Sequence, residues 1–390
     1  MRKALVVGGT SGVGLALTLK LIEQGYQHVY IVGKEGFDRK NLTDDQNAVL
    51  DMHTTVELVN LSHENYDFLE SFNDIDTLII TSGFGRVALF EELKQAEIDN
   101  LVKCNMLSTI RIISHYYNKI KGDDDFYCAV MGSIAGHIAS PLFSVYGASK
   151  SGLCSFIENV NCELAHDGYK NRILDVSPGS LKGTNFNGTG NELSLLEEVS
   201  NEILNRMHYR ECLYIPKYDE IYKSVLERYN KDSMKFGIES YDYKAKNGRV
   251  STKPQLVVGY LSGTFDLFHI GHLNLLKRAK EQCDYLIVGV HSSGKWKGKE
   301  TFIPFEERLA IVESICYVDK AVESFTEDSD AYDVFKYDKL FVGSDYKGTE
   351  RFLKYEEYFG DKGVEIVYFP YTTGTSSTQL RDAIKKDKKQ

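Results

Sequence analysis

Residues 4–14, Ala-Leu-Val-Val-Gly-Gly-Thr-Ser-Gly-Val-Gly, place an apolar run directly before a glycine-rich turn. Far downstream, an apolar run at residues 256–260 leads into residues 263–272, Gly-Thr-Phe-Asp-Leu-Phe-His-Ile-Gly-His. Each stretch has the form of a buried strand that turns into a helix, which is where α/β folds bind phosphate groups. The first suits a dinucleotide and the second a free triphosphate, so the chain is expected to act twice on one small metabolite.

Length and composition bound the class of protein. A chain of 390 residues exceeds a usual single domain, and a hydrophobic content of 42% is ample for two cores. The formal net charge of −10 argues against a nucleic-acid partner, which would call for a basic face. The lysine-rich residues 385–389 are interpreted as a solvated helix end.

Targeting features are also absent from the sequence pattern. No uninterrupted apolar stretch reaches the ~20 residues that cross a bilayer, and the N-terminus runs straight into a strand without signal-peptide architecture. The seven cysteines form no Cys-x-x-Cys pair, which is typical of reduced thiols. We therefore expect a cytoplasmic protein without a membrane partner.

The first part of the chain alternates short apolar runs with helical patterns. Strands are predicted at residues 4–7, 28–32, 55–59, 77–80, 126–131 and 172–176, and helices at 15–23 and 142–164. This alternation predicts an α/β fold with a doubly wound parallel sheet of the Rossmann type. Two charged, tyrosine-rich helices are expected at 193–204 and 218–229.

A second alternation begins after a polar stretch with Gly and Pro. Strands are predicted at residues 256–260, 285–290, 339–342 and 365–369, and helices at 273–282 and 305–313. We therefore predict a first domain at 1–245, a linker at 246–255 and a smaller Rossmann-like α/β domain at 256–390.

The glycine-rich turn indicates cofactor binding. Glycines at 8, 12 and 14 let the backbone approach a pyrophosphate, which the following helix N-terminus stabilises. At the end of the second strand, an NAD-selecting site would carry a carboxylate, but this chain has Gly33-Lys34. Lys34 suits a 2′-phosphate, so NADP(H) is favoured.

A serine, a tyrosine and a lysine carry the first chemistry. Tyr146 and Lys150 are four residues apart, which places both on one face of a helix. A neighbouring ammonium stabilises phenolate, so we expect Lys150 to lower the pKa of Tyr146 and make it a usable general acid. Ser133 follows a strand and can hold a substrate carbonyl oxygen.

Together with Asn105 and the Pro178-Gly179 pair, these residues resemble the short-chain dehydrogenase/reductase family over residues 1–245. The resemblance implies that Tyr146 donates the proton, that Lys150 binds the nicotinamide ribose and that Asn105 supports a relay water. It implies cofactor contacts from Gly8, Thr10, Ser11, Gly12, Val13, Gly14, Lys34, Leu61, Pro178, Gly179 and Thr184. Two scaffold positions depart from the family, Val7 before the first glycine and Ile80-Thr81-Ser82-Gly83 for its Asn-Asn-Ala-Gly.

The second motif indicates nucleotidyl transfer. In His269-x-Gly271-His272, imidazole N–H groups can bond a triphosphate while a helix N-terminus adds its dipole. A basic loop at 295–299, a loop at 343–346 after a strand and a hydroxyl-rich run at 373–378 follow in a sensible order to contact phosphates.

Residues 256–383 resemble the small cytidylyltransferases, most of all those that use glycerol 3-phosphate. The resemblance implies that His269 and His272 bind CTP and stabilise the transition state, and that Lys297 with Lys299 bridges CTP and the incoming phosphate. It implies nucleotide or substrate contacts from Gly263, Thr264, Phe265, Asp266, Lys299, Arg308, Asp345, Ser376, Ser377 and Thr378. Mg²⁺ would accompany CTP, with no side chain assigned to ligate it.

Departures from this second family concern its charges. Cys316 stands where an arginine is common, residues 371–378 lack the arginine of the family's run, and Ser292-Ser293 replace an acidic residue. The acceptor is therefore expected to differ from plain glycerol 3-phosphate. A nucleotide other than CTP stays open, because adenylyl-transferring relatives share the His-x-Gly-His motif.

The economical pathway joins the two activities. The first domain would reduce a ketose phosphate, with ribulose 5-phosphate as the leading candidate, and the second would couple the alditol phosphate to CTP. The product, CDP-ribitol, would serve capsule or teichoic-acid synthesis by pathway analogy. Two alternatives remain: the same activities on a glycerol or hexitol phosphate, and a single activity with one degenerate domain that serves dimerisation. Both resemblances imply a homodimer or larger homo-oligomer.

Overall fold

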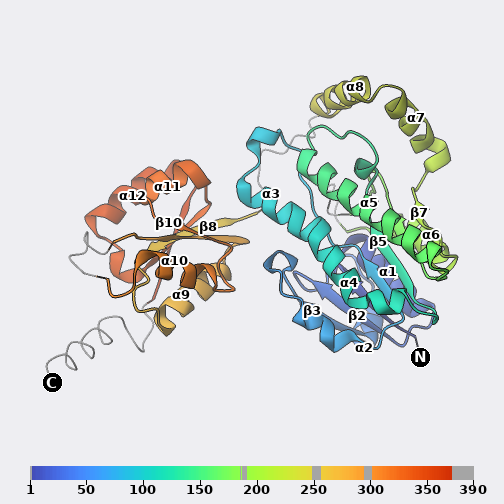
Figure 1. The fold of residues 1–390 in the computed structure, drawn as a ribbon, viewed down its shortest axis with the longest axis horizontal. Helices are drawn as coiled ribbons and strands as arrows, with labels where there is room; N and C mark the ends of the chain where they lie inside the picture. Colours follow the sequence, from blue (N-terminus) through green and yellow to red (C-terminus); the bar gives the residue numbers. More distant parts are fainter. Residues whose placement is uncertain (1, 185, 187–190, 248–255, 294–300, 371–390) are drawn as a thin grey trace. The chain divides into compact units, whose positions relative to one another are not determined.

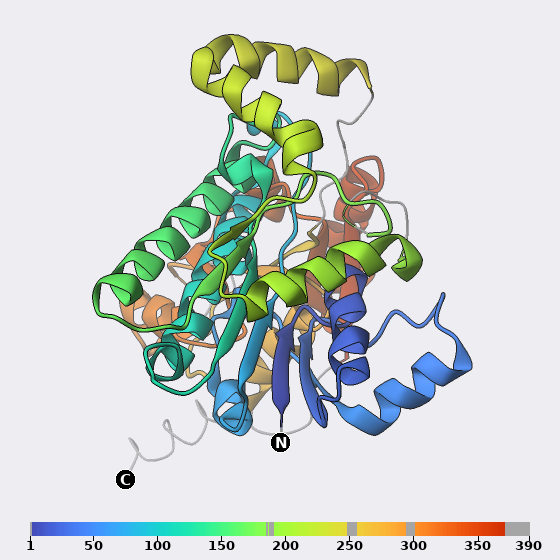
Figure 2. The same ribbon diagram turned by 90° about the vertical axis from the view of Figure 1, so that its right-hand side faces the viewer.

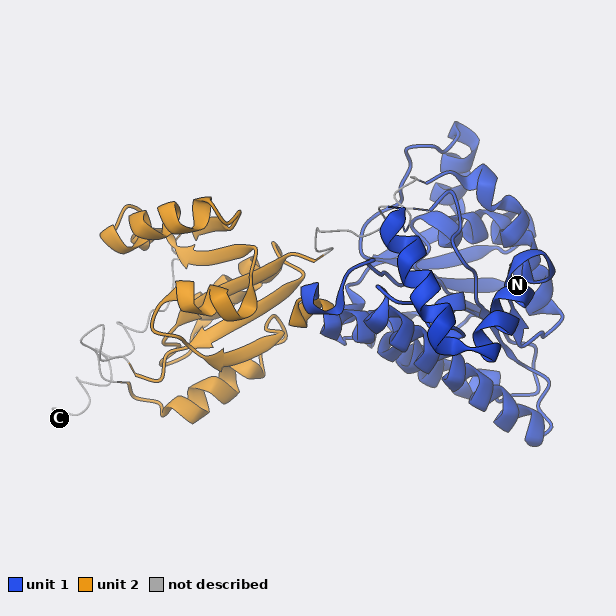
Figure 3. Cartoon of the chain, turned by 90° about the horizontal axis from the view of Figure 1, so that it is seen from above, with its two compact units in different colours: residues 1–93, 98–252 blue, residues 94–97, 253–390 orange. Residues whose placement is uncertain are grey.

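The computed structural model describes residues 2–184, 186, 191–247, 256–293 and 301–370. Its Cα positions divide the chain into two compact units, residues 1–93 with 98–252 and residues 94–97 with 253–390, which Figure 3 colours separately. The boundaries predicted for the domains stay a prediction, because most of the expected linker lies outside the described residues.

A seven-stranded, wholly parallel sheet forms the centre of the first unit. Its spatial order is β3-β2-β1-β4-β5-β6-β7, and Figure 1 labels β2, β3, β5 and β7 of this sheet. The order reverses direction between β1 and β4, which is the point where open α/β sheets bind ligands at their carboxyl ends. The strands are β1 (Lys3–Val7), β2 (His28–Gly33), β3 (Thr54–Leu58), β4 (Thr77–Ile80), β5 (Tyr127–Met131), β6 (Ile173–Val176) and β7 (Leu213–Tyr214).

Helices connect these strands, and two more follow the last one. The α-helices are α1 (Gly12–Glu23), α2 (Asp44–His53), α3 (Gln95–Val102), α4 (Ser108–Ile120), α5 (Ser144–His166), α6 (Glu197–His208), α7 (Lys223–Lys231) and α8 (Ser233–Lys246). Figure 2 shows α7 and α8 as a helical hairpin at one end of the unit.

The two faces of the first sheet are covered by different helices. Successive strand residues point to opposite faces, and β1 shows this clearly. Leu5 and Val7 are buried against α4 and α5, whereas Ala4 and Val6 are buried against α1 and α6. Both faces are therefore apolar, which explains why the strands read as continuous hydrophobic runs.

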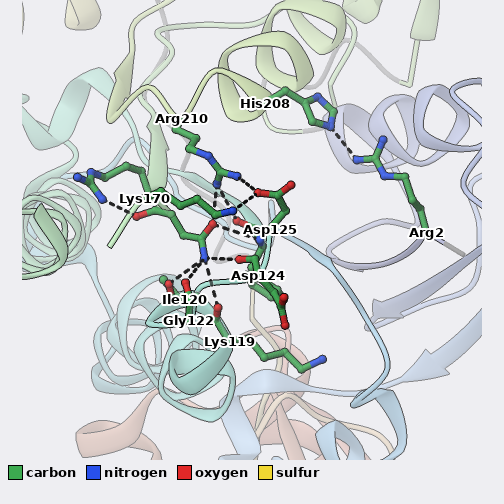
Figure 4. A network of polar contacts seen from close by, with 12 residues as sticks. Arg2, Lys119, Ile120, Gly122, Asp124, Asp125, Lys170, His208 and Arg210 are labelled. Carbon is green, nitrogen blue, oxygen red and sulfur yellow. Dashed lines mark hydrogen bonds and ion pairs between the residues drawn. The ribbon is translucent and has the colours of Figure 1, made fainter. Parts of the chain in front are cut away.

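A polar network holds the amino-terminal edge of this sheet, opposite the edge that carries the candidate site. The Asn171 side chain donates to the carbonyls of Ile120, Gly122 and Asp124, and its oxygen accepts from Arg210 at 2.6 Å. Arg210 also pairs with Asp125 at 2.5 Å (Figure 4). Since Asn171 is fully buried, the network satisfies backbone groups that would otherwise be costly to bury.

The second unit repeats the architecture on a smaller scale. Its five parallel strands have the order β10-β9-β8-β11-β12, with the reversal between β8 and β11. They are β8 (Val258–Gly263), β9 (Tyr285–Val290), β10 (Lys320–Glu323), β11 (Lys339–Gly343) and β12 (Glu365–Phe369). The helices are α9 (Ile270–Lys280), α10 (Phe305–Glu313), α11 (Asp328–Phe335) and α12 (Glu350–Gly360).

Helices again cover both faces. Leu261 of β8 belongs to the core beneath α9 and α10, whereas Val258 and Tyr260 belong to the core beneath α11 and α12. The expected α/β class with two parallel sheets is confirmed. Among the described residues, no helix has both the length and the apolar character needed to cross a bilayer.

Several elements differ from the sequence prediction. The helix expected at 193–204 is a 3₁₀ turn (Leu193–Leu196) followed by α6, and the helix expected at 218–229 begins as a π turn (Tyr218–Tyr222) before α7. Strands β7 and β10 were not predicted. Both lie at sheet edges and are at most half-buried, so they lack the apolar run that marks a central strand.

Candidate active sites

The glycine-rich turn lies where β1 passes into α1, at the reversal point of the first sheet. Gly8 adopts a φ of +87°, and a Cβ there would lie 2.6 Å from the Ser82 nitrogen. A Cβ on Gly14 would lie 2.1 Å from the carbonyl oxygen of Gly8. These positions require glycine because strand and helix approach so closely. At Gly12, φ is +53° and a Cβ would meet nothing closer than 3.7 Å.

The N-terminus of α1 has an acceptor that sequence reasoning missed. The Gly12 N–H donates to the side-chain oxygen of Asn191 at 2.7 Å, and Asn191 is 3% exposed. Its amide nitrogen donates to the Asp38 carbonyl at 3.4 Å. Ser11, the N-cap of α1, makes no capping bond with its side chain. Nothing in one sequence distinguishes this asparagine, because the contact spans 179 positions.

The remaining predicted cofactor residues surround the turn. Thr10 is buried against Gly33, where a Cβ would lie 2.5 Å from the threonine methyl, and Lys34 is exposed just beyond β2. Thr184, which follows β6, lies against Gly12. Others are placed as follows: Val13 and Leu61 are buried, the Pro178 carbonyl accepts from the Ile134 N–H at 2.9 Å, and Gly179 lies against the Tyr222 ring.

The structure brings Ser133, Tyr146 and Lys150 together at the carboxyl edge of the sheet. Ser133 follows β5 and caps a 3₁₀ turn, since its hydroxyl accepts the Ala135 N–H at 3.1 Å. Lys150 donates to the Met131 carbonyl at 2.7 Å, and its Nζ lies 6.0 Å from the centre of the Tyr146 ring. All three side chains are buried, at 9% exposure or less.

Asn105 lies in a π turn (Lys103–Leu107) between α3 and α4, an irregularity often found at functional sites. Its side chain donates to the Phe84 carbonyl at 2.8 Å and accepts the Phe84 N–H at 3.0 Å. A Cβ on Gly83 would lie 3.1 Å from Asn105 Oδ1 and 3.4 Å from Lys150 Nζ. Asn105 therefore fixes the loop that closes over Lys150.

Aromatic side chains that the sequence did not indicate flank the phenol. The ring centres of Phe143 and Phe186 lie 5.2 Å and 5.5 Å from that of Tyr146. A Cβ on Gly85 would lie 2.6 Å from the Tyr146 ring and 3.2 Å from the Phe186 ring. The tyrosine thus has little freedom to move.

The expected net lowering of the Tyr146 pKa is wrong for this structure. Burial raises the pKa of Tyr146 above its ordinary value, and only a hydrogen bond with Ser133 lowers it. Burial also lowers the pKa of Lys150 to about 8. Both shifts have the same cause: a dry site disfavours phenolate and ammonium alike.

The second site lies between β8 and α9. His269 is the N-cap of α9, and its Nδ1 accepts the Gly271 N–H at 3.0 Å. This bond assigns the proton of the neutral ring to Nε2. The rings of His269 and His272 are stacked, with centres 4.0 Å apart. Phe265 and Phe268 pack against His272, at centre distances of 5.3 Å and 5.4 Å.

The loop before these histidines is strained. Phe265 and Leu267 have φ values of +51° and +50°, a conformation that costs energy for residues other than glycine. Between them, Asp266 is 2% exposed and accepts from the Phe302 and Ile303 N–H groups, at 3.0 Å and 3.1 Å. A Cβ on Gly263 would lie 2.9 Å from the Phe265 ring.

Arg308 differs from the expectation of a direct nucleotide contact. It is fully buried on α10 and donates to the carbonyls of Thr264, His291, Ser292 and Ile303. Burial lowers the pKa of its guanidinium. Its donors are directed at backbone, so it ties together the loops that border the histidines.

The other predicted residues of the second site fall into two groups. Asp345 is exposed in the 3₁₀ turn after β11 (Ser344–Tyr346), at the carboxyl edge of the sheet. A Cβ on Gly343 would lie 2.4 Å from its Oδ1. The positions predicted to clamp phosphates lie outside the described residues: Lys297, Lys299, Ser376, Ser377 and Thr378.

Comparison with known proteins decides the family of each unit. Residues 2–193 match the short chain dehydrogenase family, and residues 260–383 match the cytidylyltransferase-like family. The glycerol-3-phosphate cytidylyltransferase of Bacillus spizizenii is 40% identical over 123 residues, which are 30% of this chain and 90% of that protein. The chain is a short-chain dehydrogenase fused to a cytidylyltransferase.

Relatives of the dehydrogenase part are more distant. The 3-oxoacyl-[acyl-carrier-protein] reductase of Buchnera aphidicola is 26% identical over 212 residues, 53% of this chain and 84% of that protein. A solved short-chain dehydrogenase from Streptomyces avermitilis is 18% identical and covers 64% of this chain and 100% of its own, with a TM-score of 0.49. The fused dehydrogenase–cytidylyltransferase is thus an enzyme with an oxidoreductase and a nucleotidyltransferase domain.

Proposed function

We propose that the fused enzyme carries out two consecutive steps on one metabolite. The dehydrogenase domain reduces the carbonyl of a ketose phosphate, ribulose 5-phosphate in the leading case, with NADPH to an alditol phosphate. The cytidylyltransferase domain joins that phosphate to CTP, which gives a CDP-alditol, CDP-ribitol in the leading case, and pyrophosphate. The convergence of Ser133, Tyr146 and Lys150 beside a glycine-rich turn, in a chain that also carries the paired histidines, supports this proposal.

In the reductase, NADPH supplies the hydride when it is bound. Tyr146 gives its phenolic proton to the oxygen of the substrate carbonyl, and its raised pKa keeps the resting phenol protonated for this role. Ser133 holds the same oxygen, and the Lys150 ammonium stabilises the phenolate that forms. The aromatic rings of Phe143 and Phe186 keep the phenol in place.

The turn from Gly8 to Gly14 fits a dinucleotide, because its glycines place no side chain between the backbone and a pyrophosphate at the N-terminus of α1. We assign the cofactor contacts predicted from the sequence to this region. Lys34, exposed beyond β2, supports NADPH over NADH because its ammonium can pair with a 2′-phosphate.

In the transferase, a phosphate oxygen of the alditol phosphate attacks the α-phosphorus of CTP, and pyrophosphate leaves. The Nε2–H of His269, together with His272 and the N-terminus of α9, stabilises charge on the phosphates. Lys297 with Lys299 is proposed to bridge CTP and the incoming phosphate, and residues 376–378 to donate to phosphate oxygens; Mg²⁺ would accompany CTP.

Two observations support an alditol phosphate as the acceptor. The curated relatives are named for glycerol 3-phosphate, the phosphate of the shortest alditol. Cys316 is exposed where an arginine is common in that family, which favours an acceptor other than glycerol 3-phosphate. The fused reductase provides a source for a longer one.

The test is product analysis with a substrate panel. The full-length enzyme is incubated with NADPH, CTP and Mg²⁺, and with ribulose 5-phosphate, dihydroxyacetone phosphate or fructose 6-phosphate. We expect NADPH oxidation and the mass of CDP-ribitol from the first. CDP-glycerol or a CDP-hexitol as the preferred product would correct the substrate, and no CDP-alditol from any ketose phosphate would refute the two-step scheme.

Two variants separate the activities. Tyr146→Phe is expected to abolish reduction while the enzyme still couples added ribitol 5-phosphate to CTP. His272→Ala is expected to have the reciprocal effect. If either variant left both activities intact, the domain concerned would be a non-catalytic module, as in the single-activity alternative.

We also propose an oligomeric state, a cellular location and a use for the product. We propose a homodimer or larger homo-oligomer in the cytoplasm, whose product feeds a cell-surface polysaccharide such as capsule or teichoic acid. Light scattering of the purified enzyme measures the assembly, and a monomeric mass at micromolar concentration would contradict it.

A further inference from the structure

A second polar cluster lies behind the reductase triad and takes no part in the reaction described above. It joins His137 after the 3₁₀ turn (Ile134–Gly136), Cys154 on α5, and Asp175 and Ser177 at the end of β6. The cysteine, aspartate and serine are at most 7% exposed. Buried titratable groups are costly unless they compensate one another, so their arrangement calls for a reason.

Hydrogen bonds order the cluster around Ser177. His137 Nε2 lies 2.9 Å from the Ser177 hydroxyl, which donates to Asp175 Oδ1 at 2.7 Å. His137 Nε2 lies 3.6 Å from Asp175 Oδ2, and Cys154 Sγ lies 3.6 Å from the serine oxygen. The histidine, cysteine and aspartate are close enough to hold a metal ion, but the Ser177 hydroxyl already fills the hydrogen-bonding positions between them.

The cluster contacts the reductase triad at Gly132, the residue that precedes Ser133. A Cβ on Gly132 would lie only 2.2 Å from Asp175 Oδ1, so the carboxylate presses against the backbone just before Ser133. The preceding residue, Met131, provides the carbonyl that accepts the Lys150 ammonium. Cys154 lies one helical turn beyond Lys150, which brings the cluster and the ammonium into the same buried region.

The charged groups of the cluster affect the protonation of Lys150. Burial lowers the pKa of Lys150 to about 8, and among the described residues the titratable groups that act against this shift are Cys154 and Asp175. Tyr146, on the same helix, is the other titratable side chain beside it. The proximity of Asp175, and then of Cys154, raises the pKa of the His137 imidazole to about 10. At neutral pH the cluster therefore holds an imidazolium beside a carboxylate.

We propose that Asp175 is a positioning residue of the reductase, whose buried carboxylate, held by Ser177 and balanced by His137, keeps Lys150 an ammonium in its dry site. The inference rests on the proposed reductase function of Lys150. His137 borders a pocket of about 290 Å³, which residues of the loop at 135–144 and Tyr229 also line.

The test is the pH profile of kcat/KM for NADPH-dependent reduction, measured with the full-length enzyme, because this profile reports the pKa values of the free enzyme. The wild-type basic limb is expected near the pKa of Lys150. Asp175→Asn keeps the shape and the acceptor for Ser177 but removes the charge, so the limb should move down by about one pH unit or more. Activity at the acidic end of the profile should be largely retained.

Two matched variants separate charge from structure. Ser177→Ala removes the hydroxyl that orders the cluster but leaves Asp175 and Cys154, so the limb should stay in place. His137→Gln breaks the same network but keeps the carboxylate, so the limb should stay or move up. This variant alone decides the matter if Asp175→Asn does not fold.

Three results would overturn the inference: an unmoved limb in Asp175→Asn, a lowered limb in His137→Gln, or a stoichiometric metal in the wild type that Cys154→Ala loses. Absence of any reductase activity in the wild type would instead refute the proposed function, so the two failures are distinguishable.

Discussion

The guanidinium of Arg308 donates a hydrogen bond to the carbonyl oxygen of Thr264, 44 positions earlier in the chain, at 2.5 Å. Thr264 begins the strained loop that ends at His269. The same guanidinium donates to His291 and Ser292, just after β9. A fully buried side chain thereby sets the spacing between the histidine loop and the loop after the neighbouring strand.

Arg308→Lys tests this role. Lysine has a compact ammonium with three donors and cannot reproduce the fork that reaches four carbonyls. Because buried carbonyls lose their partners, we expect the second unit to lose about 3 kcal/mol of stability. Calorimetry measures that loss, and transferase activity should fall while ketose reduction persists. A variant with unchanged unfolding temperature and a raised KM for CTP alone would show a direct nucleotide contact instead.

His269 combines a capping role with a chemical role, and two substitutions separate them. Asparagine is a good N-cap, so His269→Asn should retain the fold of α9 while transferase kcat falls by roughly 100-fold or more. His269→Ala should lose the activity and also about 1 kcal/mol of stability. Equal stability of the two variants, measured by thermal unfolding, would argue against the cap.

The same histidine predicts a pH dependence of stability. Burial lowers the pKa of His269 in the folded protein. The folded state therefore binds the proton less well than the unfolded state, whose imidazole titrates near about 6.5. The stability that comes from the neutral His269 ring is present above the pKa of the unfolded imidazole. It is lost as the pH falls through the lower pKa of His269 in the folded protein. Unfolding temperatures should decline more in the wild type than in His269→Asn on acidification, and parallel declines would contradict the assignment.

Lys34 is expected to set the choice of cofactor. In Lys34→Asp the carboxylate repels a 2′-phosphate and can accept from ribose hydroxyls, so the ratio of kcat/KM for NADPH to that for NADH should fall by roughly tenfold or more. Lys40→Asp makes the same charge change at another exposed position of the same loop and should leave the ratio unchanged. If this ratio changed equally in both variants, the cause would be a long-range electrostatic effect and not a contact between Lys34 and the 2′-phosphate.

Asn191 should affect cofactor affinity without touching the chemistry. Asn191→Ala leaves the Gly12 N–H without its acceptor and releases the Asp38 carbonyl. We expect the KM for NADPH to rise by roughly 5- to 100-fold, with kcat little changed. Asn41→Ala serves as the control, because Asn41 donates to the backbone carbonyl of Asn191 and not to its side chain. A fall in kcat alone would contradict a role in shaping the turn.

The sequence by itself determined the class of fold and the chemistry of both motifs. Apolar runs that end in glycine-rich turns specify parallel strands buried on both faces, as in β1 and β8, because only helices on both sides can cover them. The spacing of Tyr146 and Lys150 determined that they share a helical face, since that periodicity is local.

Only the tertiary structure decided what surrounds those motifs. Asn191 reaches Gly12, Asp175 reaches Gly132, and Arg308 reaches Thr264 across long separations in sequence. The raised pKa of Tyr146 likewise depends on burial by residues from several segments. Local patterns set which groups are present, whereas packing sets their neighbours, their solvation and therefore their charge.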